Sequence, residues 1–273
     1  MKIAIASLNQ VWQDKKANKV LCEAFVKNAS IQSSDLIIFP EMTLTGFSVK
    51  NTTLSEEISK SETLEWFSVI AKKYGINIVF GALLHEGKAT APSNMICVSS
   101  NSGAVEPLYS KIHLFSLSGE DRYLSSGDRI ATYKMGDMIF GFAICYDLRF
   151  PELFSAMAEA CDVIVVIANW PSSRVSHWNV LLRARAIETG SPVFGVNRTG
   201  IDGNNIDYGN NSSILVMPNG EVEDASFSSG NLSIYEIDKQ QLKAYYNNFP
   251  TTRDKRYDLY EKILREKINV KKQ

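Results

Sequence analysis

The chain has 273 residues, with 45% hydrophobic and 22% charged side chains, which is typical of a globular protein. Its 29 basic and 30 acidic side chains give a formal net charge of -1, which argues against nucleic acid as the main partner. No apolar run approaches the roughly 20 residues of a membrane span, and the first apolar run is too short for a signal peptide. We therefore expect no membrane contact.

The cysteines bear on metal binding and on the cellular compartment. Cys22, Cys97, Cys145 and Cys161 form no C-x-x-C pair, which argues against zinc and iron–sulfur frameworks. A chain of this length with so few cysteines and no export signal is typical of a reducing cytoplasm. The sequence therefore predicts a cytoplasmic protein with no metal and no cofactor.

Strands and helices alternate along the chain. Helix-boundary residues support the assignment, with Ser61 as an N-cap, Pro151 in a first turn, and Gly75 and Gly190 at helix ends. In chain order we expect a strand at 2–8, a helix at 15–29, a strand at 35–39, a helix at 61–74, strands at 76–84, 94–99, 106–110 and 138–144, a helix at 151–160, a strand at 162–168, a helix at 178–189, and strands at 193–197, 212–217 and 232–237.

No linker rich in Pro, Gly or Ser divides the chain, so we predict one α/β domain over residues 1–250 with helices covering sheet faces. Residues 35–39 and 162–168 echo each other, because each is a buried strand that follows a helix and ends in polar groups. Two layers related in this way would form a two-sheet sandwich. Residues 251–273 are charged and partly helical, and we predict a C-terminal arm that is a candidate for packing on a partner subunit.

Cys145 is the first residue with chemical promise. The uncharged run at 138–144 predicts a strand buried on both faces, and Cys145 follows where that strand ends and a helix is about to begin. Ligands bind beyond the carboxyl ends of strands in open α/β sheets, and a helix N-terminus favours thiolate formation. The alternative is a buried structural cysteine, since free cysteines are among the most buried residues.

Glu41 and Lys111 are the second and third candidates. Glu41 follows a buried strand and Pro40, where an unpaired carboxylate would be costly. Its alternative is a helix-capping or salt-bridged glutamate. Lys111 lies between aromatic and aliphatic residues, which argues against a purely solvated role, although a surface lysine on an edge strand is the simpler reading.

A carboxylate, an ammonium and a thiol make chemical sense together. An ammonium lowers the pKa of a nearby thiol, a carboxylate accepts its proton, and the ammonium with a backbone N–H stabilises an oxyanion. No histidine is required. A Cys–His arrangement with His85, His113 or His177 stays open at this point, because the sequence does not place these side chains in space.

Three motifs in this chain resemble those of the nitrilase superfamily, the carbon–nitrogen hydrolases. They are residues 40–42 (PEM), 111–115 (KIHLF) and 144–152 (ICYDLRFPE), which match in order and spacing, and the resemblance covers roughly residues 1–250. It implies an α-β-β-α sandwich, two sheets with helices on the outer faces. It also implies assembly as a homodimer or larger homo-oligomer.

The resemblance implies a role for each motif residue. Glu41 would be the general base, Lys111 would stabilise the oxyanion, and Cys145 would be the nucleophile that forms a thioester. The backbone N–H of Tyr146 would complete the oxyanion hole. Glu120 stands where amidases of the family carry a second glutamate that positions substrate; its alternative is an exposed loop carboxylate.

The chain looks most like the bacterial-type ω-amidases within this superfamily. The similar stretches are residues 168–174 (ANWPSSR), 177–178 (HW), 182–188 (LRARAIE), 197–203 (NRTGIDG) and 208–210 (YGN). Such enzymes hydrolyse the terminal amide of 2-oxoglutaramate to 2-oxoglutarate and ammonia. Two alternatives stay open, an N-carbamoyl amino acid hydrolase or other small aliphatic amidase or nitrilase, and a catalytically silent nitrilase-like binding protein.

A substrate with a carboxylate at its far end needs a cation in the pocket. Arg174 follows the strand that ends near Trp170 and is the first candidate, because a guanidinium grips a carboxylate through two hydrogen bonds. A structural salt bridge is its alternative. Phe47, Phe115 and Trp170 are candidate pocket walls, with aromatic core packing as the alternative. We expect Arg183 and Arg185, among other helix residues, to make structural pairs.

Overall fold

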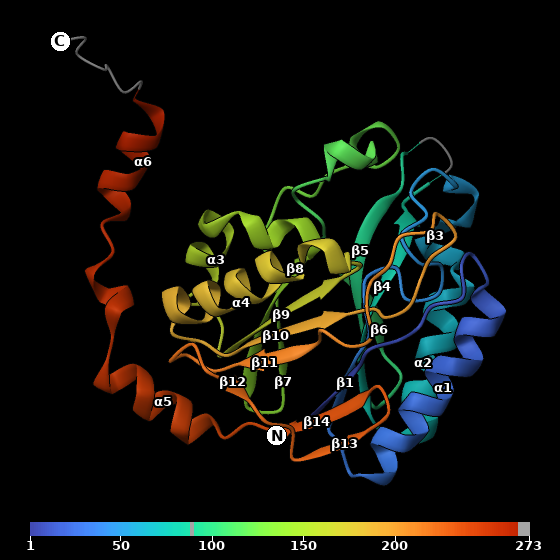
Figure 1. Ribbon diagram of the computed structural model, residues 1–273, viewed down its shortest axis with the longest axis horizontal. Coiled ribbons are helices and arrows are strands. Elements are labelled where there is room, and N and C mark those ends of the chain that lie inside the picture. The colour runs from blue at the N-terminus through green and yellow to red at the C-terminus, as the bar shows by residue number, and fades with distance from the viewer. Residues whose placement is uncertain (88–89, 267–273) are drawn as a thin grey trace.

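The computed structural model describes residues 1–87 and 90–266 and shows two β-sheets packed face to face between outer helices (Figure 1). The eight-stranded sheet contains, in spatial order, β13 (Phe227–Ser229), β14 (Leu232–Glu236), β1 (Lys2–Ala6), β2 (Leu36–Ile38), β4 (Asn77–His85), β5 (Ser93–Ser99) and β6 (Val105–Ser110), with β3 (Glu56–Glu57) paired to β4. The six-stranded sheet contains β12 (Val222–Glu223), β11 (Ile214–Val216), β10 (Val193–Asn197), β9 (Val163–Ala168), β8 (Met138–Ile144) and β7 (Thr132–Met135).

The long helices cover the outer faces of the two sheets (Figure 1). Helices α1 (Lys15–Ile31) and α2 (Glu62–Tyr74) lie on the eight-stranded sheet, while α3 (Pro151–Met157) and α4 (Val175–Thr189) lie on the six-stranded sheet. The fold is therefore the expected α-β-β-α sandwich. After the last strand come α5 (Lys239–Asn248) and α6 (Tyr257–Arg265), and α6 stands away from the sandwich.

Apolar side chains hold these layers together. The cluster between the sheets includes Ile5 and Ile38 from one sheet and Phe140, Val165 and Phe194 from the other, each at most 1% exposed. Separate clusters fill the space beneath α1 and α2 and beneath α3 and α4. Central strands are therefore buried on both faces, which explains why they read as continuous apolar runs in the sequence.

Strand direction brings the functional motifs to one edge of the sandwich. Strands β1, β2 and β4 are parallel, as are β8, β9 and β10. Because β4 pairs antiparallel with β5 and β5 with β6, strand β6 again runs in the direction of β4. Glu41 follows β2, Lys111 follows β6, Cys145 follows β8, and Asn169 follows β9, so these residues all lie beyond carboxyl ends of strands.

The structure confirms most of the predicted elements. The echoing segments at 35–39 and 162–168 become β2 in one sheet and β9 in the other. The side chain of Ser61 caps α2, and Gly75 and Gly190 end α2 and α4 with φ of 64° and 65°. Turns at 101–103 and 218–220 connect β5 to β6 and β11 to β12.

Other elements differ from prediction. The helix expected at 151–160 ends at Met157. Helix α4 begins at Val175, three residues before the predicted start at 178. The sequence did not reveal this first turn because it is exposed and carries no apolar periodicity. Four short or exposed elements, β3, β7, β12 and β13, and the polar helix α5 were not predicted. Residues after the β8 strand form the 3-10 helix η5 (Cys145–Arg149) before α3 begins.

Two observations bear on partners. None of the helices in residues 1–87 and 90–266 has the length and apolar character needed to cross a bilayer. Within the same residues, His, Cys, Asp and Glu side chains form no group of three placed to hold a metal ion. The expected absence of a cofactor and the domain boundary at residue 250 stay predictions.

Candidate active site

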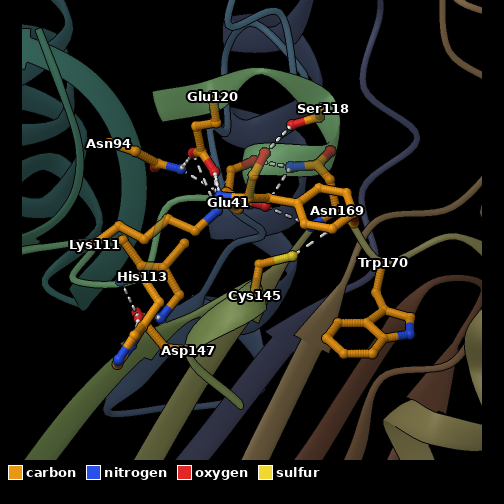
Figure 2. A network of polar contacts seen from close by, with 12 residues as sticks. Glu41, Asn94, Lys111, His113, Ser118, Glu120, Cys145, Asp147, Asn169 and Trp170 are labelled. Atoms are coloured by element: carbon orange, nitrogen blue, oxygen red, sulfur yellow. Dashed lines mark hydrogen bonds and ion pairs between the residues drawn. The ribbon is translucent and has the colours of Figure 1, made fainter. Parts of the chain in front are cut away.

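Lys111 lies between two carboxylates in the interior of the protein. Its Nζ is 3.1 Å from Oε1 of Glu41 and 2.8 Å from Oε2 of Glu120, and all three side chains are fully buried (Figure 2). The alternative interpretations, in which Lys111 is a surface lysine and Glu120 an exposed loop carboxylate, are therefore wrong. Glu41 is salt-bridged, as its alternative held, but the ion pair is buried.

Hydrogen bonds from several segments fix the carboxylate of Glu41. The side-chain amide of Asn94 donates to Oε1 at 2.7 Å, and the backbone N–H of Asn169 donates to Oε2 at 2.8 Å. The side-chain amide of Asn169 also donates to the carbonyl of Glu41 at 2.7 Å. Glu120 receives the backbone N–H of Phe115 at 2.7 Å. Both carboxylates therefore have the partners that burial demands.

Cys145 lies directly after β8 and faces the same cluster (Figure 2). Its Sγ is 4.0 Å from the carbonyl oxygen of Asn169, and its backbone φ of 48° is in the left-handed region that side chains other than glycine rarely adopt. Tyr146 follows as the second residue of η5. Its N–H belongs to a first helical turn, whose N–H groups have no acceptor within the helix.

Burial and the charges around Cys145 keep its thiol protonated. Burial and the negative charge of Glu41 raise the pKa of Cys145 well above its usual value, and the opposing effect of Lys111 is smaller. The ammonium of Lys111 lowers the thiol pKa as expected, but burial and Glu41 together outweigh its effect. Burial by itself lowers the pKa of Lys111, but Glu41 and Glu120 outweigh burial and raise it above its ordinary value.

Cys145 and Lys111 line a cavity of about 80 Å³. The four predicted pocket residues all lie in its wall, together with neighbours from several loops: Phe47, Phe115, Ser118, Tyr146, Arg149, Asn169, Trp170, Pro171, Arg174, Ile206 and Tyr208. Among the described residues of this lining, every charged side chain is a cation and none is a carboxylate. Trp170 is 3% exposed and also packs against Trp178, so the pocket and core readings both hold for Trp170.

The two arginines of the lining differ in their surroundings. The Arg149 guanidinium lies 4.7 Å from the ring centre of Trp170 and 3.4 Å from Nδ1 of His177. The Arg174 guanidinium lies 5.7 Å from the ring centre of Phe115. By contrast, the predicted structural pair exists for Arg185, which bonds to Glu188 on the same helix.

Sequence reasoning assigned no role to three site residues. Asn169 directly follows the predicted strand at 162–168, and this position is a usable signal. Arg149 lay inside the third motif but received no role. Asn94 lies within β5, and nothing in the neighbouring sequence distinguishes it from an ordinary strand residue. The three histidines, all among the described residues, make their polar contacts with groups other than Cys145: His85 with the carbonyl of Gly87, His113 with Asp147, and His177 with Arg149.

Comparison with known proteins places the chain in a family. Residues 2–247 match the carbon–nitrogen hydrolase family, and the chain belongs to it. It is 32% identical to the 2-oxoglutaramate amidase of Bacillus subtilis over 87% of this chain and 91% of that protein. It is 31% identical to the omega-amidase YafV of Yersinia enterocolitica over 93% of this chain and 96% of that one.

The fold comparison agrees with the sequence comparison. The crystal structure of XC1258 from Xanthomonas campestris, a CN-hydrolase superfamily protein with an arsenic adduct in its active site, superposes with a TM-score of 0.85. The two sequences are 28% identical, and the alignment covers 94% of this chain and 97% of that one. The carbon–nitrogen hydrolase fold thus extends over nearly the whole chain.

Glu41→Gln separates two effects of the Glu41 carboxylate. Its negative charge raises the pKa of Cys145, so the variant has a lower Cys145 pKa than the wild type. The general-base role that the family resemblance implies for Glu41 predicts a loss of turnover of about 100-fold to 10,000-fold. The pH dependence of iodoacetamide labelling measures the pKa, and ammonia release measures turnover. Glu65→Gln, on the exposed face of α2, is the control. An unchanged or higher Cys145 pKa in Glu41→Gln would contradict this electrostatic account.

Proposed function

We propose that the protein hydrolyses the terminal amide of a small ω-amide of a 2-oxo acid, namely 2-oxoglutaramate to 2-oxoglutarate and ammonia. The observation that carries this proposal is a half-buried thiol beside a buried Glu41–Lys111–Glu120 cluster, in a small cavity whose charged lining is cationic. The names of relatives about 30% identical to the chain support the same substrate class.

The first half of the proposed reaction forms a thioester on Cys145. Glu41 accepts the thiol proton as Sγ attacks the amide carbonyl, because the thiol is not ionised beforehand. The carbonyl π electrons move to oxygen, and the oxyanion is stabilised by the Lys111 ammonium and the Tyr146 N–H. Collapse of this intermediate breaks the C–N bond, and Glu41 returns its proton to the leaving nitrogen, which departs as ammonia.

The second half regenerates the thiol. Glu41 accepts a proton from water as the water oxygen attacks the thioester carbonyl, and Lys111 again faces the oxyanion. The C–S bond then breaks, the acid is released, and the proton returns to Cys145. Glu120 is not part of the cavity lining but contacts Lys111 Nζ directly. We therefore propose that Glu120 orients the substrate indirectly, by fixing Lys111.

The cationic lining supports a substrate that carries a carboxylate. Arg174 and Arg149 both lie in the cavity wall, and a guanidinium binds a carboxylate through paired hydrogen bonds. Phe47, Phe115 and Trp170 supply the apolar part of the wall that would pack against the short carbon chain of the substrate. Recognition of the far carboxylate by Arg174, assisted by Arg149, is part of the proposal.

The decisive experiment is a substrate panel with ammonia detection. Purified protein is expected to release ammonia from 2-oxoglutaramate faster than from N-carbamoyl amino acids, simple aliphatic amides or nitriles. Cys145→Ala is expected to abolish release while circular dichroism shows an intact fold. Mass spectrometry of the wild type should show an acyl adduct on Cys145.

The other outcomes separate the alternatives. Preferential turnover of a carbamoyl compound, a simple amide or a nitrile would replace the proposed substrate with that class. No turnover and no Cys145 adduct with any compound would indicate a silent binding protein. Turnover that survives in Cys145→Ala would contradict the thioester mechanism.

Arg174→Ala tests recognition of the carboxylate. Loss of a charge-assisted contact worth about 1.5–3 kcal/mol corresponds to a roughly 10-fold to 150-fold lower kcat/KM for 2-oxoglutaramate. Butanamide, which lacks the carboxylate, should be turned over equally by variant and wild type. Arg183→Ala is the matched control, because Arg183 lies on α4 and bonds to the carbonyl of Gly220 away from the cavity. An equal loss on both substrates would argue against carboxylate recognition.

We further propose that the protein works in the reducing cytoplasm as a homodimer or larger homo-oligomer. The four cysteines, all within the described residues, are free, which supports a reducing compartment. Helix α6 presents a row of exposed apolar side chains that supports contact with a second copy: Tyr257, Leu259, Tyr260, Ile263 and Leu264. These residues belong to the predicted C-terminal arm.

Substitution on α6 tests this assembly. Wild-type protein should sediment at a multiple of the 30.5 kDa chain mass, and the double variant Ile263→Glu/Leu264→Glu should shift toward a monomer, because it places charge on the apolar row. Glu261→Gln, on the same helix, is the control. A monomeric wild type, or an unchanged mass in the double variant, would contradict an interface through α6.

A further inference from the structure

Asp147 is a buried carboxylate outside the Glu41–Lys111–Glu120 cluster. Its Oδ1 accepts the backbone N–H of His113 at 2.8 Å and lies 2.9 Å from the ring Nδ1 of His113 (Figure 2). Its Oδ2 accepts the hydroxyl of Tyr109 at 2.8 Å and the backbone N–H of Ile144 at 3.0 Å. Each oxygen of Asp147 therefore has two polar partners.

The partners of Asp147 flank two residues of the proposed mechanism. Tyr109 lies two residues before Lys111, and His113 lies two residues after it. Ile144 directly precedes Cys145. Since Tyr109 is on β6 and Ile144 ends β8, one carboxylate ties the segment that carries Lys111 to the segment that carries Cys145 across the two sheets.

The bond to Ile144 also acts on the conformation of Cys145. Cys145 has a φ of 48°, and such a conformation persists when surrounding contacts over-determine it. The N–H of Ile144, just before Cys145, donates to the side chain of Asp147, two residues after Cys145, so this bond closes the turn that contains Cys145. The orientation of the Cys145 side chain therefore depends on Asp147.

A second contact joins the same two segments. The ring of His113 stacks on the ring of Phe150, with 3.7 Å between ring centres and 7° between planes. Phe150 directly follows η5, which begins at Cys145. The Lys111 segment thus holds residues 145–150 at Asp147 and at Phe150.

We propose that Asp147 is a positioning residue that fixes the separation between Lys111 Nζ and Cys145 Sγ. Asp147 does not line the cavity, so it acts through these two groups and not on the substrate. A misplacement of about 1 Å in an active site costs roughly 100-fold in rate. The inference rests on the proposed function only for the assay of turnover.

The first experiment compares isosteric substitutions of two aspartates that accept backbone N–H groups near opposite ends of β8. Asp147→Asn places an NH₂ group against the backbone N–H of either His113 or Ile144, and it should lower kcat about 100-fold per folded molecule, with KM within about threefold of wild type. Asp162→Asn is the control, because Asp162 accepts the N–H of Ile139 at 2.8 Å and pairs with Lys239 far from the cavity. This control should lose stability and keep its kcat.

The second experiment needs no substrate. Tyr109→Phe removes one donor to Asp147 without a change of charge, and the Lys111 ammonium, which lowers the pKa of Cys145, is then held less closely. The pH midpoint of Cys145 labelling by iodoacetamide should rise by about half a unit or more. Tyr235→Phe, at another buried tyrosine of the core between the sheets, should leave the midpoint unchanged.

The two experiments distinguish failure of this inference from failure of the proposed function. If 2-oxoglutaramate is not turned over by the wild type, the labelling midpoint of Tyr109→Phe still tests Asp147. A wild-type kcat per folded molecule in Asp147→Asn would overturn the inference. So would a wild-type midpoint in Tyr109→Phe, including the case in which Asp147→Asn does not fold.

Discussion

The site depends on one buried ammonium held between two carboxylates. Removal of Lys111, Glu41 and Glu120 from water is costly, and the cost is offset only because each group has charged and hydrogen-bonding partners at close range. Two carboxylates against one ammonium leave one excess negative charge in the interior. Burial, together with that excess charge, raises the pKa of the Cys145 thiol. In the proposed reaction, the Glu41 carboxylate accepts the thiol proton when sulfur attacks.

The sandwich supplies the conditions for this cluster. The apolar layer between the sheets excludes water, which strengthens electrostatic interactions inside the site. Parallel strand order carries the polar residues to one edge, where turns of unusual geometry then aim them. Met42 and Cys145 both have a positive φ, of 47° and 48°, and each lies beside or at a proposed catalytic residue. Two residues with this strained backbone geometry thus lie where the side chains must converge.

Charge is divided between the interior and the cavity wall. The cluster behind Cys145 carries the excess negative charge, whereas Arg149 and Arg174 add positive charge to the wall. An amide that carries a carboxylate at its other end would be drawn by its carboxylate to the arginines and repelled by it from the inner cluster. This division would orient the neutral amide toward Cys145. The polarity of the site therefore favours one binding direction for such a substrate.

The sequence by itself indicated one α/β domain and the three motifs, because buried strands read as apolar runs and chemical residues follow directly at their ends. The two-sheet sandwich was implied by the family resemblance that those motifs carry. It placed Glu41, Lys111 and Cys145 near strand ends, but it did not fix the net direction of the Cys145 pKa shift. Only the tertiary structure decided that direction, because burial and the distance to Glu41 depend on the packing of two sheets. The same holds for the bond of Asn94 to Glu41, 53 residues away, and for the bonds of Asp147 to His113 and Tyr109, 34 and 38 residues away, because such distant contacts leave no local signal.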